Sequence, residues 1–558
     1  MSSSVTSQRM LQQETNIVST DAQPWYRQHL TSDSLSPQPF VLTKFITPRG
    51  PTAPPFLCVA AFPWHLNSLT DESLYDISAA KIAELQSHWK ASITPWLGSI
   101  LVGSIGQAWI FRKAGPPLCL QVPPCSDEHM EKSLGRHVKC AAWALDPRSW
   151  TAPLVVLAAF GMVFVYDPMA GKLISSLRGH GGEITSIATH HMHPYRFLTS
   201  SRDHTTRLYD LRFAPRKGPN NPPWPPSKRP SRAGTGFGLH ITGSEGDGFG
   251  RCIAVLAGGR SGGHQAAVLH AAWHPTEDLI ATCGADRAVK IWRTPYVDYK
   301  KVYEDTEHLA REDKPLFTTD LIHDARVLSV WWLSHDILIS HSAPALMRGK
   351  SVHHMYEEPG TVAVWQWLGY DRYLGVGGLR PVMKGSCDDW RNSRSFKLLS
   401  VYSVPMTTPS IYVASSPSRK HDPLLLVPAG NVIRIFNIAR LNHRDKPLFP
   451  LDGETFIEDE DEELEHMTSA MQLGSFDLEE ERAYEVGFES EESFPPAVYK
   501  RRRPEKKLFE QVHGWMARHD GPRLPTELPN IEKCQLAFGQ HVILGIGGQG
   551  SLYSWKLA

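Results

Sequence analysis

Short apolar runs alternate with tight turns along most of the chain, and the spacing of these runs repeats. Each unit has an apolar strand, a short turn, a second apolar strand, a turn with Asp or Gly, and a third strand that ends in an aromatic residue. Two copies are clear. They cover Gly179-His180 with 184–188, 196–200 and 207–211, and Gly263-His264 with 268–273, 278–282 and 289–292. Such a repeat predicts a series of small antiparallel sheets.

Polar residues occupy equivalent places in both copies. The distance from the Gly-His pair to the turn Asp is 23 residues in one copy (180 to 203) and 22 in the other (264 to 286), and the aromatic residue follows 6 later in each. A turn Asp can accept a hydrogen bond from the His, whose ring can link to a Ser or Thr and to the aromatic residue. These blade-locking residues are His180, Asp203, Tyr209, His264, Asp286 and Trp292.

Five weaker copies complete the series. Two strong and five weak units predict a seven-bladed WD40 β-propeller, an all-β fold in which radial closure leaves only short strand edges exposed. We expect the segment 40–45 to supply the last blade with its outer strand and so to close the ring. The expected blades cover 56–112, 136–178, 179–213, 263–296, 324–369, 395–441 and 533–558 within a propeller domain of 40–558.

Several segments fall outside the repeats. Residues 1–39 and the Pro/Gly-rich, basic stretch 214–250 cannot bury a core, so we expect both to be disordered. Residues 343–359 form a smaller insertion. The long insertion 442–530 carries an acidic run, 458–463, and then a basic cluster that is either a nuclear localisation signal or a solvated charge run. This cluster is Lys500, Arg501, Arg502, Arg503, Lys506 and Lys507.

The composition narrows the setting of the protein. The 558 residues include 58 Lys and Arg and 58 Asp and Glu, so no overall charge attracts nucleic acid or an anionic membrane. The eight cysteines show no C-x-x-C pair, which favours a reducing compartment. Because no apolar run reaches 18 residues, the sequence predicts a soluble intracellular protein with no direct nucleic-acid or membrane partner.

The two strong repeats and the segment after them resemble the EED/ESC family of Polycomb WD-repeat proteins. The resemblance rests on 179–184, 201–204, 286–292, 314–317 and 336–340 in the family's order, and covers 136–370 well, whereas the 442–530 insertion is foreign to the family. It implies a nuclear, non-catalytic scaffold that holds a helix of a SET-domain histone methyltransferase, together with other Polycomb subunits, in chromatin silencing. It also implies contact with histone tails.

Family members read trimethylated histone lysine with an aromatic cage, in which each ring contributes about 0.5–2 kcal/mol through cation–π attraction. The resemblance gives Phe56 and Tyr412 as cage candidates, each subject to a small shift in alignment. At the remaining cage position this sequence has Lys139, where the family has tyrosine. A cation there would repel the methylated ammonium group.

Other motifs have simpler interpretations, and we expect no cofactor, no metal and no catalytic site. Gly545 to Gly550 reads G-x-G-x-x-G, but a strand follows instead of a helix, so a β-turn is favoured over a dinucleotide site. The close histidines 190, 191 and 193 suit a His-Pro turn better than a metal site. Tyr209-Asp-Leu-Arg212 is similar to the WD-x-R box of cullin-RING ubiquitin ligase substrate receptors, which is the alternative function, although 291–293 lacks the matching Asp.

Overall fold

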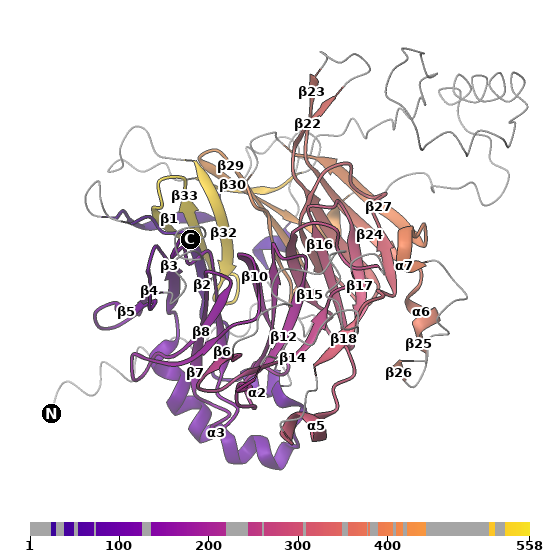
Figure 1. Ribbon diagram of the computed structural model, residues 1–558. Coiled ribbons are helices and arrows are strands. Elements are labelled where there is room, and N and C mark those ends of the chain that lie inside the picture. Colours follow the sequence, from indigo (N-terminus) through magenta and orange to yellow (C-terminus); the bar gives the residue numbers. More distant parts are fainter. Residues whose placement is uncertain are drawn as a thin grey trace, which may run out of the picture.

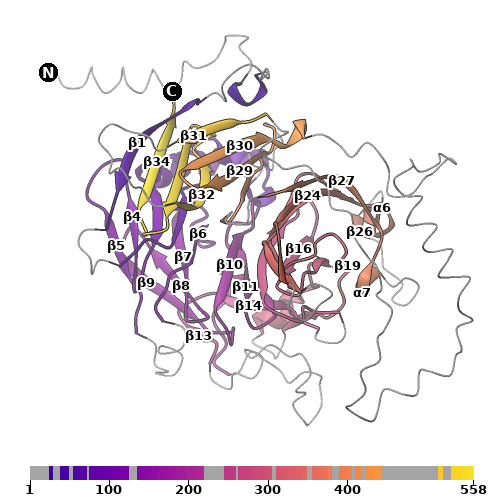
Figure 2. The ribbon, with the colours of Figure 1, turned by 90° about the horizontal axis from the view of Figure 1, so that it is seen from above.

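The computed structural model describes residues 24–28, 38–48, 54–71, 74–124, 135–218, 244–258, 262–304, 309–348, 355–375, 378–379, 389–404, 409–416, 421–441, 513–518 and 530–558. In these parts of the chain, seven sheets of four or five strands surround a common axis (Figures 1 and 2). The fold is therefore a seven-bladed β-propeller, as the sequence predicted.

The first four blades begin in chain order, each with its innermost strand, but the fifth strands of blades 2 and 3 come from segments between strands of the next blade. Blade 1 contains β2 (Cys58–Ala61), β3 (Ile100–Gly103), β4 (Gln107–Phe111) and β5 (Leu118–Gln121). Blade 2 contains β6 (Cys140–Leu145), β7 (Pro153–Ala159), β8 (Met162–Asp167), β9 (Lys172–Leu177) and β13 (Gly246–Asp247). Blade 3 contains β10 (Ile184–Thr189), β11 (Arg196–Ser201), β12 (Thr206–Asp210), β14 (Arg251–Leu256) and β18 (Ala310–Glu312). Blade 4 contains β15 (Val268–Trp273), β16 (Leu279–Gly284), β17 (Val289–Arg293) and β19 (Phe317–Thr319).

The last three blades complete the ring. Blade 5 contains β20 (Val327–Trp332), β21 (Ile337–Ser342), β24 (Thr361–Trp367) and β27 (Phe396–Ser403). Blade 6 contains β28 (Tyr412–Ala414), β29 (Leu424–Ala429), β30 (Val432–Asn437) and β31 (Trp515–Arg518). Blade 7 contains β32 (Ile531–Ala537), β33 (Val542–Gly547), β34 (Leu552–Leu557) and β1 (Phe40–Ile46). Two hairpins, β22 (Ala345–Arg348) with β23 (Met355–Glu358) and β25 (Leu374–Gly375) with β26 (Gly378–Leu379), lie outside the blades.

The N-terminal strand closes the ring. β1 pairs antiparallel with β34, and the register runs from Phe40 opposite Leu557 to Ile46 opposite Leu552. This is the pairing that the sequence led us to expect for 40–45. β1 precedes blade 1 in the sequence but is a strand of blade 7. The backbone hydrogen bonds between β1 and β34 therefore tie the start of blade 1 to the last blade.

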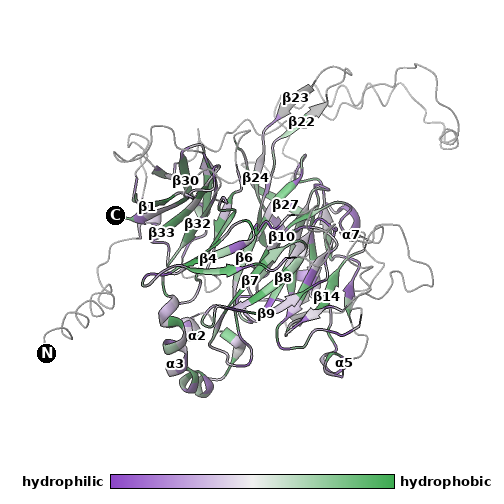
Figure 3. Ribbon diagram, turned by 60° about the vertical axis from the view of Figure 1, so that its left-hand side comes forward, coloured by the Kyte–Doolittle hydropathy of each residue, from purple (hydrophilic) through white to green (hydrophobic). Residues whose placement is uncertain are grey.

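Apolar side chains fill the space between blades, and the strands of the blades are largely hydrophobic in Figure 3. All seven residues of β7 are buried, as expected for a strand covered on both faces. Two indoles, one buried and one partly buried, also make polar links between neighbouring blades. Trp143 Nε1 donates to the carbonyl of Ala60 over 3.2 Å, and Trp273 Nε1 donates to that of Ala188 over 2.9 Å. These bonds hold neighbouring innermost strands together.

A helical segment between β2 and β3 was not expected from the sequence. It contains α2 (Ser68–Asp71), η2 (Leu74–Asp76), α3 (Ala79–Ile93) and η3 (Thr94–Trp96). Trp89 and Ile93 of α3 are fully buried, whereas most of its other residues are not. The helix begins where the Ser78 side chain accepts a hydrogen bond from the Lys81 amide, and Pro95 follows its last turn.

The two ends of the propeller therefore differ. α2, α3 and α5 (Tyr299–Tyr303) lie together at one end, which we call the helix-bearing face, and the β22–β23 hairpin extends from the other end (Figure 1). The remaining short helices are α6 (Tyr370–Tyr373), α7 (Asp389–Asn392), η1 (Trp25–Arg27) and η6 (Ile438–Arg440). The helix-bearing face joins several blades, because the Tyr75 hydroxyl donates to the Trp150 carbonyl and the Tyr75 amide to the Met192 carbonyl.

Five expected blade ends are wrong. Blades 1, 3, 4, 5 and 6 were expected to end after their third strands, but each has a fourth strand beyond its expected end, whereas the expected blade 2 already includes β9. For blade 6 this strand is β31, which lies inside the expected insertion 442–530, and β27, expected in blade 6, pairs with β24 of blade 5. The fourth strands follow connections of different lengths, so the spacing of the repeat does not reveal them.

Disorder was also assigned too widely. Within 214–250, Gly246–Asp247 pairs with β9, and the buried Glu245 carboxylate accepts hydrogen bonds from the amides of Arg216 and Cys252. Within 1–39, the Arg27 guanidinium pairs with Asp422 over 2.7 Å. Single side chains thus anchor short pieces of segments whose composition is typical of disorder.

Candidate functional site

The blade-locking residues of blade 4 form a continuous chain of hydrogen bonds. His264 Nδ1 lies 2.9 Å from Asp286 Oδ2, and Nε2 lies 2.8 Å from Thr282 Oγ1. Trp292 Nε1 donates to the same hydroxyl over 2.8 Å. Because the Thr282 oxygen accepts from the indole, its proton is directed to His264 Nε2, which makes the ring neutral with the proton on Nδ1. The network therefore joins the turn before β15, which contains His264, and the turn after β16, which contains Asp286, to Trp292 on β17.

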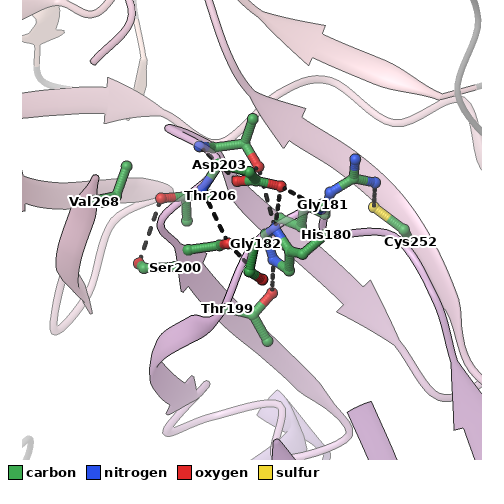
Figure 4. A network of polar contacts seen from close by, with 12 residues as sticks. His180, Gly181, Gly182, Thr199, Ser200, Asp203, Thr206, Cys252 and Val268 are labelled. Atoms are coloured by element: carbon green, nitrogen blue, oxygen red, sulfur yellow. Dashed lines mark hydrogen bonds and ion pairs between the residues drawn. The ribbon is translucent and has the colours of Figure 1, made fainter. Parts of the chain in front are cut away.

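Blade 3 has the same core of interactions (Figure 4). His180 lies between Asp203 and Thr199, with Nδ1 2.9 Å from Asp203 Oδ2 and Nε2 2.7 Å from Thr199 Oγ1. Asp203 Oδ2 also accepts from the Gly181 amide over 3.1 Å. Tyr209 differs from Trp292 in that its buried ring stacks on Phe197, with 5.3 Å between the ring centroids. The Asp203 carboxylate therefore forms these hydrogen bonds within blade 3.

A third network, in blade 5, escaped the sequence analysis. His323 Nε2 lies 2.6 Å from Ser340 Oγ, which accepts from Trp365 Nε1 over 3.1 Å, and Thr361 Oγ1 takes the place of the Asp, 2.9 Å from His323 Nδ1. The signal was present, because the His-to-hydroxyl separations are 19, 18 and 17 residues in blades 3, 4 and 5. The 343–359 insertion between the second and third strands hid it.

The electrostatics of these networks favour neutral histidines beside ionised carboxylates. Burial lowers the pKa of His180 and of His264, although their aspartates act in the opposite direction. Burial alone would raise the pKa of Asp203 and of Asp286, but attraction to the histidine and its hydrogen bond bring both below the ordinary value. Without a carboxylate partner, His323 has its pKa lowered by burial to about 3. Such groups suit structural locking and not proton transfer near neutral pH.

The glycine-rich motif forms a turn. Gly550, with φ +73°, lies between the antiparallel strands β33 and β34, and its amide donates to the Gly547 carbonyl over 2.7 Å. Its own carbonyl accepts from the Phe56 amide over 3.1 Å. A β-hairpin therefore occupies the place where a dinucleotide site requires the start of a helix, as the sequence analysis favoured.

The histidines 190, 191 and 193 also belong to a turn. His190 Nδ1 accepts hydrogen bonds from the amides of Met192 (3.1 Å) and His193 (3.2 Å), so this nitrogen is not free to ligate a metal. In the part of the chain that the structure describes, no three His, Cys, Asp or Glu side chains are grouped as metal ligands. No helix among the described residues is long and apolar enough to cross a membrane.

The three residues of the expected cage region lie in different environments. Phe56 is 9% exposed and packs in a cluster with Val102, Ile546 and Leu552 between blades 1 and 7. Lys139 Nζ pairs with Glu183 Oε1 over 2.6 Å, and its side chain is 45% exposed. Among the described contacts, none joins Phe56 to Lys139 or to Tyr412.

Tyr412 lies on an innermost strand beside aromatic neighbours that the sequence analysis missed. Its ring meets that of Trp331 edge-on at 6.5 Å, and the Trp331 ring lies 5.0 Å from the His270 ring. The three residues come from β28, β20 and β15, the innermost strands of blades 6, 5 and 4. Burial raises the pKa of Tyr412 and lowers that of His270 to about 4. The doubled Trp331-Trp332 was the available signal, because alternate residues of a strand face opposite sides.

Arg212, the arginine of the WD-x-R-like box, lies on the helix-bearing face. Its guanidinium binds Asp210 through Nε (3.0 Å) and Nη2 (2.7 Å), and 30% of its side chain is exposed. The proposed nuclear localisation cluster, 500–507, lies outside the described residues.

The WD-repeat family model, described as the WD domain with G-beta repeat, matches residues 171–210 and 250–293, which are the two strong repeats. The chain is 28% identical over 209 residues to the Polycomb group protein FIE1 of Zea mays, covering 36% of this chain and 37% of that protein. It is 26% identical over 173 residues to the Polycomb protein EED of Chaetomium thermophilum, covering 31% and 24%. The matched part thus spans 37% of the first of these relatives and 24% of the second.

The fold is similar over a much longer stretch. A chain in the structure of the Chaetomium thermophilum Polycomb Repressive Complex 2 superposes with a TM-score of 0.52 and 16% identity, covering 93% of this chain and 98% of that one. Seven blades, three of which contain a His-hydroxyl network, define the protein as a WD-repeat β-propeller. Within this class, the relatives to which the chain is similar include Polycomb proteins of plants, a fungus and an insect.

Proposed function

We propose that this protein is the non-catalytic WD-repeat scaffold of a Polycomb-type histone methyltransferase complex and that it holds the SET-domain subunit. The observation that carries the proposal is the similarity to Polycomb WD-repeat proteins of plants, a fungus and an insect. The fold similarity to a chain of a Polycomb Repressive Complex 2 structure supports it.

The polar groups of the blades support a scaffold in preference to an enzyme. Asp203, Asp286 and three network histidines form hydrogen bonds inside single blades. A general acid or base must reach a substrate, but these groups are occupied by neighbouring hydroxyl and amide groups. The networks therefore maintain blade shape, which a binding platform requires.

Histone tails are the second ligand in this proposal. Tyr412, beside Trp331, offers an aromatic surface near the propeller axis. Burial of Phe56 and the charge of Lys139 work against a trimethyl-lysine cage. We therefore propose that any tail binding depends little on trimethylation. We also propose a nuclear location, for which the basic cluster 500–507 is the candidate signal.

Affinity purification of the tagged full-length chain from nuclei, with quantitative mass spectrometry, tests the proposal. We expect a SET-domain methyltransferase in near-stoichiometric amount. A matched purification of the Arg212→Ala variant separates the alternatives. A Polycomb scaffold should retain the methyltransferase, whereas a cullin-RING substrate receptor should yield a cullin adaptor that is lost from the variant. Recovery of the adaptor without any methyltransferase would overturn the proposal.

The alternative function, a substrate receptor of a cullin-RING ubiquitin ligase, has two observations in its favour and two against it. Tyr209-Asp-Leu-Arg212 provides the box, and Arg212 lies on a face of the propeller. However, Asp210 holds the guanidinium through two of its nitrogens, and the next blade has Ile291-Trp-Arg293 without the Asp. We therefore favour the Polycomb scaffold.

A further inference from the structure

Two arginines share one buried carboxylate where blade 3 meets the helix-bearing face. Asp210 has no solvent exposure, and its Oδ2 accepts from Arg212 Nη2 over 2.7 Å and from Arg196 Nε over 3.0 Å. Arg212 Nε adds a bond of 3.0 Å to Oδ1. With one carboxylate for two guanidinium groups, this cluster has one positive charge in excess.

Aromatic rings hold these guanidinium groups in place. The guanidinium carbon of Arg212 lies 4.8 Å from the centroid of the Tyr195 ring and 5.1 Å from that of Tyr299, which belongs to α5. Arg196 Nη2 donates to the Tyr299 hydroxyl over 2.6 Å. A guanidinium fixed by a carboxylate and two rings loses little side-chain entropy when it binds a ligand.

The cluster continues into exposed aromatic surface. Tyr303 is 68% exposed, and its ring lies 4.8 Å from that of Phe213, while Tyr296 is 85% exposed. Tyrosine and arginine are the residue types most enriched where proteins bind one another. The composition therefore favours a protein ligand over a nucleic acid.

We propose that this surface, formed by Tyr195, Arg196, Arg212, Tyr299 and Tyr303, docks an acidic linear segment of a protein partner. Among the described residues, Arg212 uses Nε and Nη2 for Asp210, so Nη1 is available to donate to a carboxylate of the ligand. The excess positive charge selects an acidic ligand, and the tyrosine rings cover its apolar side chains. The site does not depend on which complex contains the propeller.

Blade 2 offers a matched control. Arg148 Nε and Nη2 bind Asp146, two residues earlier, over 2.9 and 2.6 Å, which reproduces the geometry of Asp210 and Arg212. The described contacts of Asp146 include no second arginine, so this pair is neutral. An acidic ligand should therefore depend on Arg212 and not on Arg148, although Arg148 is the more exposed of the two.

Fluorescence polarisation with the purified full-length protein and a labelled Glu-Glu-Phe-Glu-Glu-Leu peptide tests the site. We expect saturable binding that weakens with salt and falls about tenfold or more in Arg212→Ala, the loss typical of a hydrogen bond to a charged group. Arg148→Ala should bind as the wild type does, and so should the wild type in competition with a Gln-Gln-Phe-Gln-Gln-Leu peptide. Arg196 still pairs with Asp210 in Arg212→Ala, so the variant should fold, and its thermal unfolding would check this.

A variant with residues 458–463 changed to Gln and Asn tests whether the chain's own acidic run is the ligand. Peptide binding that appears only in this variant, and that still requires Arg212, would support the site and assign its occupant to the same chain. Equal binding by wild type and Arg212→Ala, or no binding by any of these proteins, would overturn the proposal. None of these results depends on recovery of a methyltransferase.

Discussion

Replacement of Thr282 by valine removes one buried hydroxyl group and nearly preserves the shape of the side chain. Thr282 is fully buried, and its hydroxyl joins His264 Nε2 to Trp292 Nε1 with two contacts of 2.8 Å. In the variant both nitrogens remain buried without this partner. Each such group costs about 1–3 kcal/mol, so the expected loss is roughly 2–6 kcal/mol in the free energy of opening blade 4.

Hydrogen exchange of peptides from β16 and β17, followed by mass spectrometry, measures this loss locally and does not require the whole propeller to unfold in one step. A loss of about 2 kcal/mol corresponds to exchange roughly 30-fold faster, since about 1.4 kcal/mol is a factor of ten. Peptides of blade 7, on the opposite part of the ring, should change little.

Thr282→Ser is the matched control, because it keeps the hydroxyl and loses one methyl group, at a cost of about 1 kcal/mol. The reasoning would be refuted if the valine and serine variants exchanged at equal rates. It would also be refuted if valine left blade 4 as stable as the wild type, since the hydroxyl would then contribute nothing to the network.

Three other predictions concern the buried histidines, the glycine turn and Lys139. His323 and the β21 residue His341 have their pKa lowered to about 3 by burial, so protonation of the unfolded chain should make each of them reduce stability by about 2 kcal/mol between pH 7 and 5, a loss absent above about pH 7. In denaturant titrations, His341→Leu should make the loss between pH 7 and 5 smaller by about 2 kcal/mol than in the wild type, and an unchanged loss would contradict the assignment. Gly550→Ala should lower the free energy of unfolding by about 2 kcal/mol or more, because φ is +73° and an added Cβ would lie 2.3 Å from Pro55 Cβ. Calorimetry should detect no NAD binding to the wild type or to this variant. Lys139→Tyr should bind a trimethyl-lysine histone peptide about threefold or more tightly than the wild type does, with the unmethylated peptide as control, and an equal affinity would remove this position from the proposed tail site.

The sequence by itself determined the repeated unit and two of its networks. The positions of His180, Asp203, His264 and Asp286 were predictable because two strands and one connecting turn separate the histidine from its carboxylate in both blades, so the spacing repeats. The closing strand was predictable for a related reason, because the last repeat lacked one strand and the N-terminal segment 40–45 was the apolar run left over.

Only the tertiary structure decided which residues from different blades meet. β31, with four residues, is defined by its pairing with β30 and is too short to show a pattern of its own. Trp331 and Tyr412 are 81 positions apart by their numbering (412 − 331), and Arg212 meets Tyr299 of the next blade. Spacing within a repeat cannot encode such contacts, because they depend on how one blade packs against the next. The contacts of Tyr412 with Trp331 and of Trp331 with His270 therefore became visible only in the folded ring. The same holds for Arg196 and Arg212, which share Asp210 on the helix-bearing face.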